Sequence, residues 1–167
     1  MPKPTKNATL FCIIASILAI VGILLGRKFD SVLISMFFLL PTIVYEIYRT
    51  EGDSTKYASR GLLVVFVAEI ILIIFNVKFD LIQFFQTNTK YIQGYEIPLG
   101  DIKVVGPILM AVLSLLLVGR TRGVYTRWLA VIIIVTSLFI IYVLDPASFS
   151  KFIKIAIDQV MLMAGMN

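Results

Sequence analysis

Residues 61–85 read GLLVVFVAEIILIIFNVKFDLIQFF, a run that is apolar enough to cross a bilayer and yet holds a carboxylate, Glu69, near its middle. On a helix, Glu69 and Asn76 fall on one narrow stripe with Asp80 and Gln83, while Val, Ile and Leu cover the other faces. An acidic side chain in hydrocarbon costs about 2.5 to 3.5 kcal/mol on insertion scales, so this stripe cannot face lipid. The sequence therefore predicts that Glu69 meets another helix, a partner protein or a wet cavity.

The composition places the whole chain in a membrane. Of the 167 residues, 59% are hydrophobic and 15% are charged, whereas soluble domains contain roughly 45 to 50% apolar residues. The mean hydropathy of +0.97 agrees with this assignment. Helices of about 20 residues, joined by short loops, account for nearly the whole length and leave no room for a soluble catalytic domain. We expect one polytopic membrane domain over residues 1–167.

The apolar runs predict an all-α fold with five membrane-spanning helices, four or six being the alternatives. The predicted spans are residues 9–26, 31–48, 61–77, 104–119 and 128–144. The basic tail before the first span also suits a signal peptide, but no A-x-A-like site follows, so we expect an uncleaved anchor.

The polar segments between the spans predict surface structure. Residues 50–60, TEGDSTKYASR, are expected to form a solvated loop, and residues 86–103 a longer connection on the membrane surface. Residues 146–164 predict an amphipathic helix lying flat in the interface, because Lys151, Lys154 and Asp158 oppose its apolar face.

Small residues mark one face of the first span. Ala15, Ala19, Gly22 and Gly26 recur every three or four residues, so they share a face that lets two helix backbones approach closely. Alanine and glycine are also common in transmembrane helices in general. We interpret this face as a helix-packing surface whose partner helix the sequence does not identify.

A second polar stripe runs along the span 31–48. Thr42 is its deep member, whereas Glu46 and Arg49 lie near the end of the span. Long charged side chains at such positions extend to headgroups and water, so we expect Glu46 and Arg49 to form an interfacial pair.

The connection before the last span predicts the orientation. It contains Arg120, Arg122 and Arg127 and no acid, which is typical of a cytoplasmic loop. With five spans, this interfacial basic loop places the N-terminus inside, although the two sides carry nearly equal numbers of Lys and Arg. The richness in Ile, Phe and Lys suggests an AT-rich prokaryotic or organellar genome, and of these we expect a prokaryotic cytoplasmic (inner) membrane. The net charge of +5 is spread through the loops, which anionic lipid headgroups explain better than nucleic acid does.

The residue types argue against an enzyme. Histidine is absent and Cys12 is the single cysteine, so imidazole ligands, disulfides within the chain and cysteine metal clusters are excluded. The sequence has no glycine-rich phosphate loop, nucleophile elbow or acidic metal-binding cluster. We therefore expect no catalytic residue, no metal and no cofactor.

Two functions remain, and both involve a candidate intramembrane polar site of Glu69, Asn76 and Thr42. In the first, Glu69 is a polar clasp between helices, and the chain is a small non-enzymatic subunit or scaffold of a larger membrane complex. Its partners are then membrane lipids and other membrane subunits, or a second copy of itself. In the alternative, Glu69 exchanges a proton or binds a cation in a channel or transporter for ions or small solutes. The small size and the short extramembrane segments favour the subunit.

Overall fold

The computed structural model describes residues 7–77, 89–92, 95–98, 102–121, 123–146, 149–150 and 153–154. Its long helices are α1 (Ala8–Lys28), α2 (Val32–Arg49), α3 (Asp53–Ile74), α5 (Ile102–Arg120) and α6 (Val124–Leu144). Strands β1 (Thr89–Ile92) and β2 (Tyr95–Pro98) form a short antiparallel pair. All five helices are long and apolar enough to span a membrane, which confirms the predicted multi-pass helical protein.

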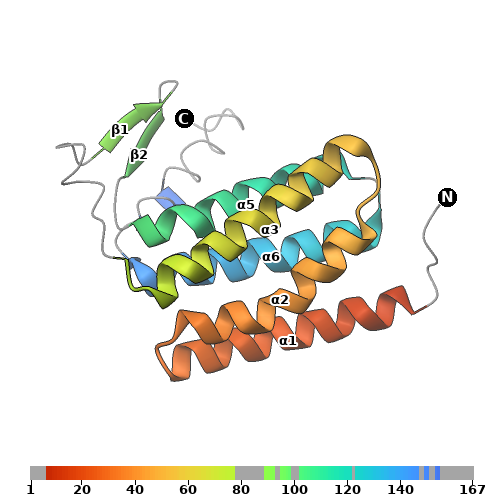
Figure 1. Cartoon of the computed structure of the whole chain (residues 1–167), viewed down its shortest axis with the longest axis horizontal. Coiled ribbons are helices and arrows are strands. Elements are labelled where there is room, and N and C mark those ends of the chain that lie inside the picture. Colours follow the sequence, from red (N-terminus) through yellow and green to blue (C-terminus); the bar gives the residue numbers. More distant parts are fainter. Residues whose placement is uncertain are drawn as a thin grey trace.

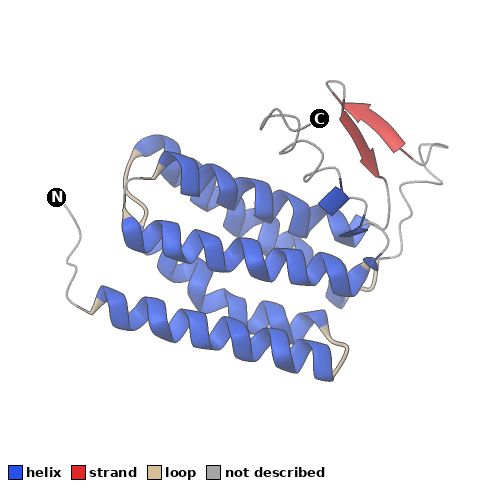
Figure 2. Cartoon of the chain, turned by 180° about the vertical axis from the view of Figure 1, so that it is seen from behind, coloured by secondary structure: helices blue, strands red, loops and turns tan. Residues whose placement is uncertain are grey.

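The helices form an antiparallel bundle in which α6 lies between the α1–α2 pair and α5 (Figure 1). Helix α6 contacts α1, α2 and α5, and α3 packs on α5 and α2. Residues 50–52 connect α2 to α3 at the end where α1 begins, which we call the N-terminal end, and α5 ends and α6 begins at this same end. The turn 29–31 and the two strands lie at the opposite end, which we call the hairpin end (Figure 2).

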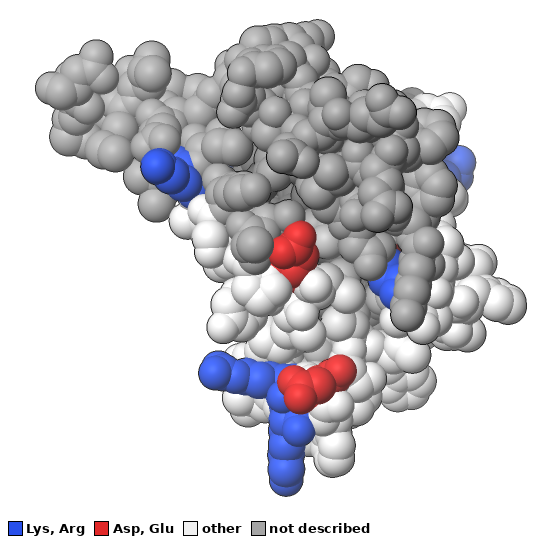
Figure 3. Space-filling view, turned by 90° about the vertical axis from the view of Figure 1, so that its left-hand side faces the viewer, with Lys and Arg blue, Asp and Glu red and all other residues white. Residues whose placement is uncertain are grey.

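The bundle is apolar both inside and on its lateral surface. Its interior holds a cluster of fully buried side chains from four helices, among them Met36, Leu39, Leu62, Phe66, Met110, Ile133 and Ile140. Large side chains such as Phe37, Val64 and Leu115 are exposed, as expected where lipid replaces water. Charged side chains of both signs are seen at the hairpin end (Figure 3), where Arg27, Lys28 and Asp30 are exposed.

Two helices end with the same left-handed turn. Asp30, which follows α1, and Asn76, which follows α3, both have φ 46°. Ser31 N–H then donates to Gly26 O and Val77 N–H to Leu72 O, each at 3.0 Å. This is the Schellman arrangement, in which Asn and Asp tolerate the left-handed conformation better than most residues. The prediction that Asn76 continues the helical stripe of Glu69 is therefore wrong, and Asp80 and Gln83 lie outside the described residues.

Helix α3 begins eight residues before the predicted span 61–77. The prediction of a solvated loop over residues 50–60 is wrong, because α3 starts at Asp53 and only residues 50–52 connect it to α2. Gly52 makes the turn with φ 102°, a conformation suited to glycine. Thr55 Oγ1 then donates to Glu51 O at 2.6 Å. The polar sequence is helical because Thr55 and Ser59 point into the bundle, whereas Lys56 and Arg60 are exposed.

Two predicted surface segments are covered only in part. The connection 86–103 contains the two strands, with Thr89 paired to Pro98 and Ile92 to Tyr95. The predicted interfacial helix 146–164 lies largely outside the described residues.

Candidate functional site

Glu69 is buried between α3 and α5. Its side chain is 1% exposed, and it lies five residues before the end of α3, closer to the hairpin end than to the middle of the bundle. The facing residue on α5 is Gly106, and a Cβ atom there would lie 2.8 Å from Cδ of Glu69 and 3.1 Å from its Cβ. The missing side chain of Gly106 therefore provides the space for the carboxylate, so α5 of the same chain covers Glu69.

Asn76 and Thr42 lie apart from this contact. Asn76 follows the end of α3 and is exposed, and its Oδ1 accepts a hydrogen bond of 2.8 Å from Lys103 Nζ. Thr42 is fully buried on α2, and its Oγ1 has no hydrogen-bond partner within the described residues. Of the three predicted residues, Glu69 and Thr42 are in the interior and Asn76 is at the surface.

A second buried carboxylate, Glu46, lies at the N-terminal end. Its side chain is fully buried, so the prediction that it reaches headgroups and water is wrong. Ser59 Oγ of α3 lies 2.7 Å from Oε1 and 2.6 Å from Oε2 and donates to the carboxylate. Thr50 Oγ1 also donates to Oε1, and it lies 3.0 Å from Glu46 O and 3.1 Å from Ser59 Oγ. We call Glu46, Thr50 and Ser59 the Glu46 cluster.

The sequence contained only part of the information needed to find the Glu46 cluster. The stripe containing Thr42 and Glu46 on one helical face was visible, and both residues are buried in α2. The partner Ser59, however, stands in a polar stretch that resembles a loop. Its position against Glu46 depends on α3 starting at Asp53 and packing against α2.

The Arg49 guanidinium, next to the Glu46 cluster, packs against two aromatic rings and does not pair with Glu46. The guanidinium carbon lies 5.9 Å from the Tyr45 ring centroid and 5.0 Å from that of Tyr125, distances typical of cation–π contacts. The Tyr125 hydroxyl is 3.1 Å from Thr9 Oγ1 on α1. Within the described part of the chain, Glu46 makes no salt bridge, and its partners are hydroxyl groups.

The small-residue face of α1 packs closely against α2. The buried residues of α1 are Ala8, Cys12, Ala15, Ala19, Gly22 and Gly26. A Cβ atom at Gly22 would lie 2.6 Å from Phe38 Cβ, and one at Gly26 would overlap Ser35 Oγ. Ser35 Oγ also donates to Gly22 O at 3.0 Å. The partner helix that the sequence did not identify is therefore α2 over this stretch.

The interfacial basic loop is only partly described. Arg120 and Arg127 are exposed at the N-terminal end, and Arg127 Nε donates to Thr121 O at 2.7 Å. Arg122 lies outside the described residues.

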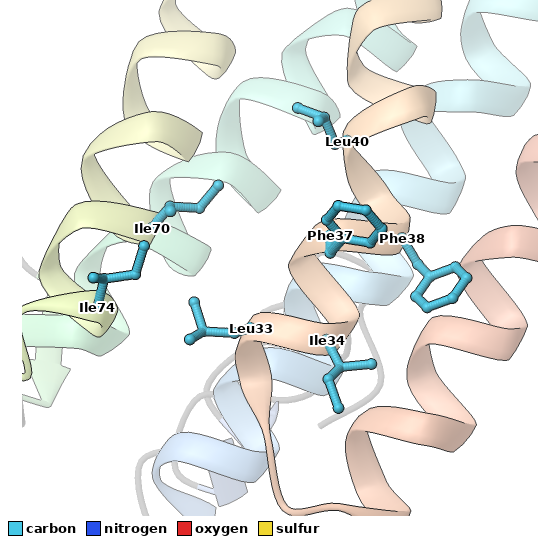
Figure 4. A pocket seen from close by; sticks show the side chains of 7 residues that line it. All are labelled: Leu33, Ile34, Phe37, Phe38, Leu40, Ile70 and Ile74. Atoms are coloured by element: carbon cyan, nitrogen blue, oxygen red, sulfur yellow. The ribbon is translucent and has the colours of Figure 1, made fainter.

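An apolar groove lies between α2 and α3 on the lateral surface (Figure 4). It has a volume of about 430 Å³ and is lined by Leu33, Ile34, Phe37, Phe38, Leu40, Ile70 and Ile74. Phe37 is 71% exposed at this surface. Without a polar side chain in its lining, the groove suits hydrocarbon or a helix better than a polar solute.

Searches against protein-family models, curated proteins and solved structures gave no match. No group of three or more His, Cys, Asp or Glu side chains in the described residues is arranged to hold a metal ion. Cys12, a free and buried thiol, is enclosed in the bundle.

Proposed function

We propose that this chain is a small, non-enzymatic integral membrane subunit or scaffold that packs against partner helices in a larger complex. The observation that supports the proposal most directly is the groove between α2 and α3, together with the exposed ring of Phe37. Association between helices in a membrane depends on van der Waals packing and not on removal of water, so a shaped apolar recess favours a helix over a flat surface.

The lining of the groove supports a helical ligand in particular. Phe37 and Phe38 provide two aromatic rings from α2, at an interplanar angle of 86°, and Ile70 and Ile74 come from successive turns of α3. Side chains spaced in this way on two helices form the walls of a groove, and the side chains of a third helix can pack into this groove. The other exposed faces are expected to contact membrane lipids. No role with nucleic acid is proposed.

Site-specific photo-crosslinking tests the proposal. A photoreactive phenylalanine analogue is placed at Phe37 in the groove and, as a matched control, at Leu115, which is 63% exposed on α5 and lines no part of the groove. We expect the groove position to crosslink in native membranes to one stoichiometric membrane protein, or to a second copy of this chain. The control position should give lipid adducts. Lipid adducts alone at both positions would refute the subunit proposal.

For the location, we propose the cytoplasmic membrane of a prokaryote with the N-terminus inside. The support is the basic loop, whose Arg120 and Arg127 lie at the same end of the bundle as the start of α1. The test replaces Cys12 by Ala and introduces one cysteine at Arg120 or at Asp30, exposed residues at opposite ends. An impermeant maleimide added to intact cells should label the Asp30→Cys variant only. Labelling of the Arg120→Cys variant alone would show the opposite orientation, with the N-terminus outside.

A further inference from the structure

The two buried carboxylates lie at different depths of one bundle. Glu46 contacts Ser59 on α3, and Glu69 follows ten residues later on the same helix. At a rise of about 1.5 Å per residue, the levels of the two carboxylates differ by about 15 Å along the axis. Glu46 is near the N-terminal end and Glu69 near the hairpin end. Both side chains are at most 1% exposed.

Three buried hydroxyl groups occupy the same levels. They belong to Thr42 on α2, Ser114 on α5 and Ser137 on α6. All three residues are fully buried, and their hydroxyl oxygens have no hydrogen-bond partner in the described residues. Counted from the helix ends, Thr42 and Ser114 lie about 10 Å from the N-terminal end, near the level of Ser59. Ser137 lies about 10 Å from the hairpin end, near the level of Glu69.

Unpaired hydroxyls in a helical interior require a physical explanation. A buried polar group without a partner costs about 1 to 3 kcal/mol. Native proteins usually satisfy such groups with internal water, which needs two to four polar partners. Two polar layers, each containing a carboxylate and at least one unpaired hydroxyl, therefore suit the entry of water from the two ends of the bundle.

An apolar layer separates the two polar layers. On α3, Leu62 and Phe66 lie between Ser59 and Glu69 on the same face, and both are fully buried. Met36, Met110 and Ile133 belong to the same cluster. A constriction of this kind can block water until it is transiently wetted, as in channels that gate by dewetting.

From these positions we propose that the bundle transfers protons across the membrane, with Glu46 and Glu69 as the two proton-binding groups and Leu62 and Phe66 as the gate between them. Glu46 takes a proton from water at the N-terminal end. The proton passes along hydrogen-bonded water to the Glu69 carboxylate, which releases it to water at the hairpin end. Each cycle takes up one proton and releases one, and the electrochemical gradient drives the transfer in either direction. The proposal concerns the interior of the chain and does not depend on occupancy of the groove.

The geometry of the Glu46 cluster favours a proton over a metal cation. The carboxylate oxygens are in direct hydrogen-bond contact with Ser59 at 2.6 and 2.7 Å, so no ion fits between these atoms. Hard metal cations also require six or more oxygen ligands in most sites. A proton needs only the carboxylate itself and a hydroxyl partner, both of which are in place.

Proton flux into vesicles tests the proposal. The full chain, with any protein that co-purifies, is reconstituted around an internal pH dye, and a potassium diffusion potential drives uptake. The wild type is expected to exceed protein-free vesicles. Glu46→Gln and Glu69→Gln should each fall to the protein-free rate, whereas Glu51→Gln, which neutralises an exposed carboxylate in the turn 50–52, should retain the wild-type rate. Wild-type flux equal to that of protein-free vesicles, or full flux in either buried variant, would overturn the proposal.

Three further variants keep the test decisive if a glutamine variant does not fold. Phe66→Ala shortens the gate and should raise the flux, whereas Val64→Ala, at a residue 67% exposed on the same helix, should not. Glu46→Asp retains an acid and should retain part of the flux. Gel filtration and circular dichroism establish that each variant is folded. A folded Phe66→Ala variant with unchanged flux would eliminate the gate and, with it, the proposed path.

Discussion

The carboxylate of Glu69 on α3 occupies the space that a side chain at Gly106 of α5 would fill. This contact explains how a spanning helix accommodates an acid: the neighbouring helix of the same chain has a glycine at the required level. The two residues are 37 positions apart in the sequence, and the contact forms only when α3 and α5 pack together.

Gly106→Ala should destabilise the bundle. The added methyl group would lie 2.8 Å from Cδ of Glu69, and overpacking of this kind costs about 1 to 3 kcal/mol. The measurement is reversible unfolding in detergent. Gly119→Ala is the matched control, because nothing lies within 4 Å of a Cβ atom at that position of the same helix. It should be neutral or stabilising by up to about 1 kcal/mol. Equal effects of the two substitutions would contradict the Glu69–Gly106 contact.

Combining Gly106→Ala with Glu69→Ala tests the same contact from the other side. Removal of the glutamate side chain frees the space for the new methyl group, so the double variant should lose less stability than the sum of the two single variants. A coupling of about 0.5 to 3 kcal/mol is typical of residues in contact. Strict additivity would mean that the two side chains act independently.

Ser59→Ala should destabilise the bundle through the Glu46 cluster. The substitution removes a hydroxyl that contacts both carboxylate oxygens of a fully buried glutamate, and a buried acceptor that loses its donor costs about 1 to 3 kcal/mol. Ser31→Ala is the control, since that hydroxyl makes no capping hydrogen bond at the start of α2. In a Glu46→Leu background, Ser59→Ala should cost less, and an unchanged cost would exclude the pairing.

Gly22→Ala should weaken the packing of α1 on α2. Its methyl group would lie 2.6 Å from Phe38 Cβ, on the rigid part of that side chain, and we expect a loss of about 1 to 3 kcal/mol. Gly61→Ala on α3 is the matched control, because its nearest neighbour would be Leu113 Cδ1 at 3.8 Å, an ordinary van der Waals distance. A comparison of thermal unfolding in the same detergent decides the matter. Equal losses in the two variants would argue against close approach of α1 and α2.

Cys12 should be unreactive while the bundle is folded. The thiol is fully buried on the small-residue face of α1, and buried cysteines are inert compared with exposed ones. A maleimide should modify Cys12 only after unfolding, as measured by mass spectrometry. A Phe37→Cys variant in a Cys12→Ala background should react in the folded state, because residue 37 is exposed. Rapid labelling of native Cys12 would contradict the packing of α1.

The candidate site could be predicted only in part, because the missing information concerned pairs of helices. The stripe containing Thr42 and Glu46 was visible in the sequence, but the burial of Glu46 depends on Ser59 from another helix. The stripe through Glu69 was extended too far, because Asn76 adopts a left-handed conformation that ends α3. The left-handed backbone conformation of Asn76 thus places this residue beyond the end of α3 and outside the interior.

The sequence by itself determined that the described part of this chain contains five apolar helices of spanning length, because the hydrocarbon thickness of a bilayer sets a length and composition that can be recognised locally. It also determined which residues of α1 share a small-residue face, since helical periodicity places them there. Only the tertiary structure decided that Gly106 faces Glu69, that Ser59 donates to Glu46 and that Phe38 packs on Gly22. Each of these contacts joins two helices, and the rotation and depth of one helix against another follow from the packing of the whole bundle.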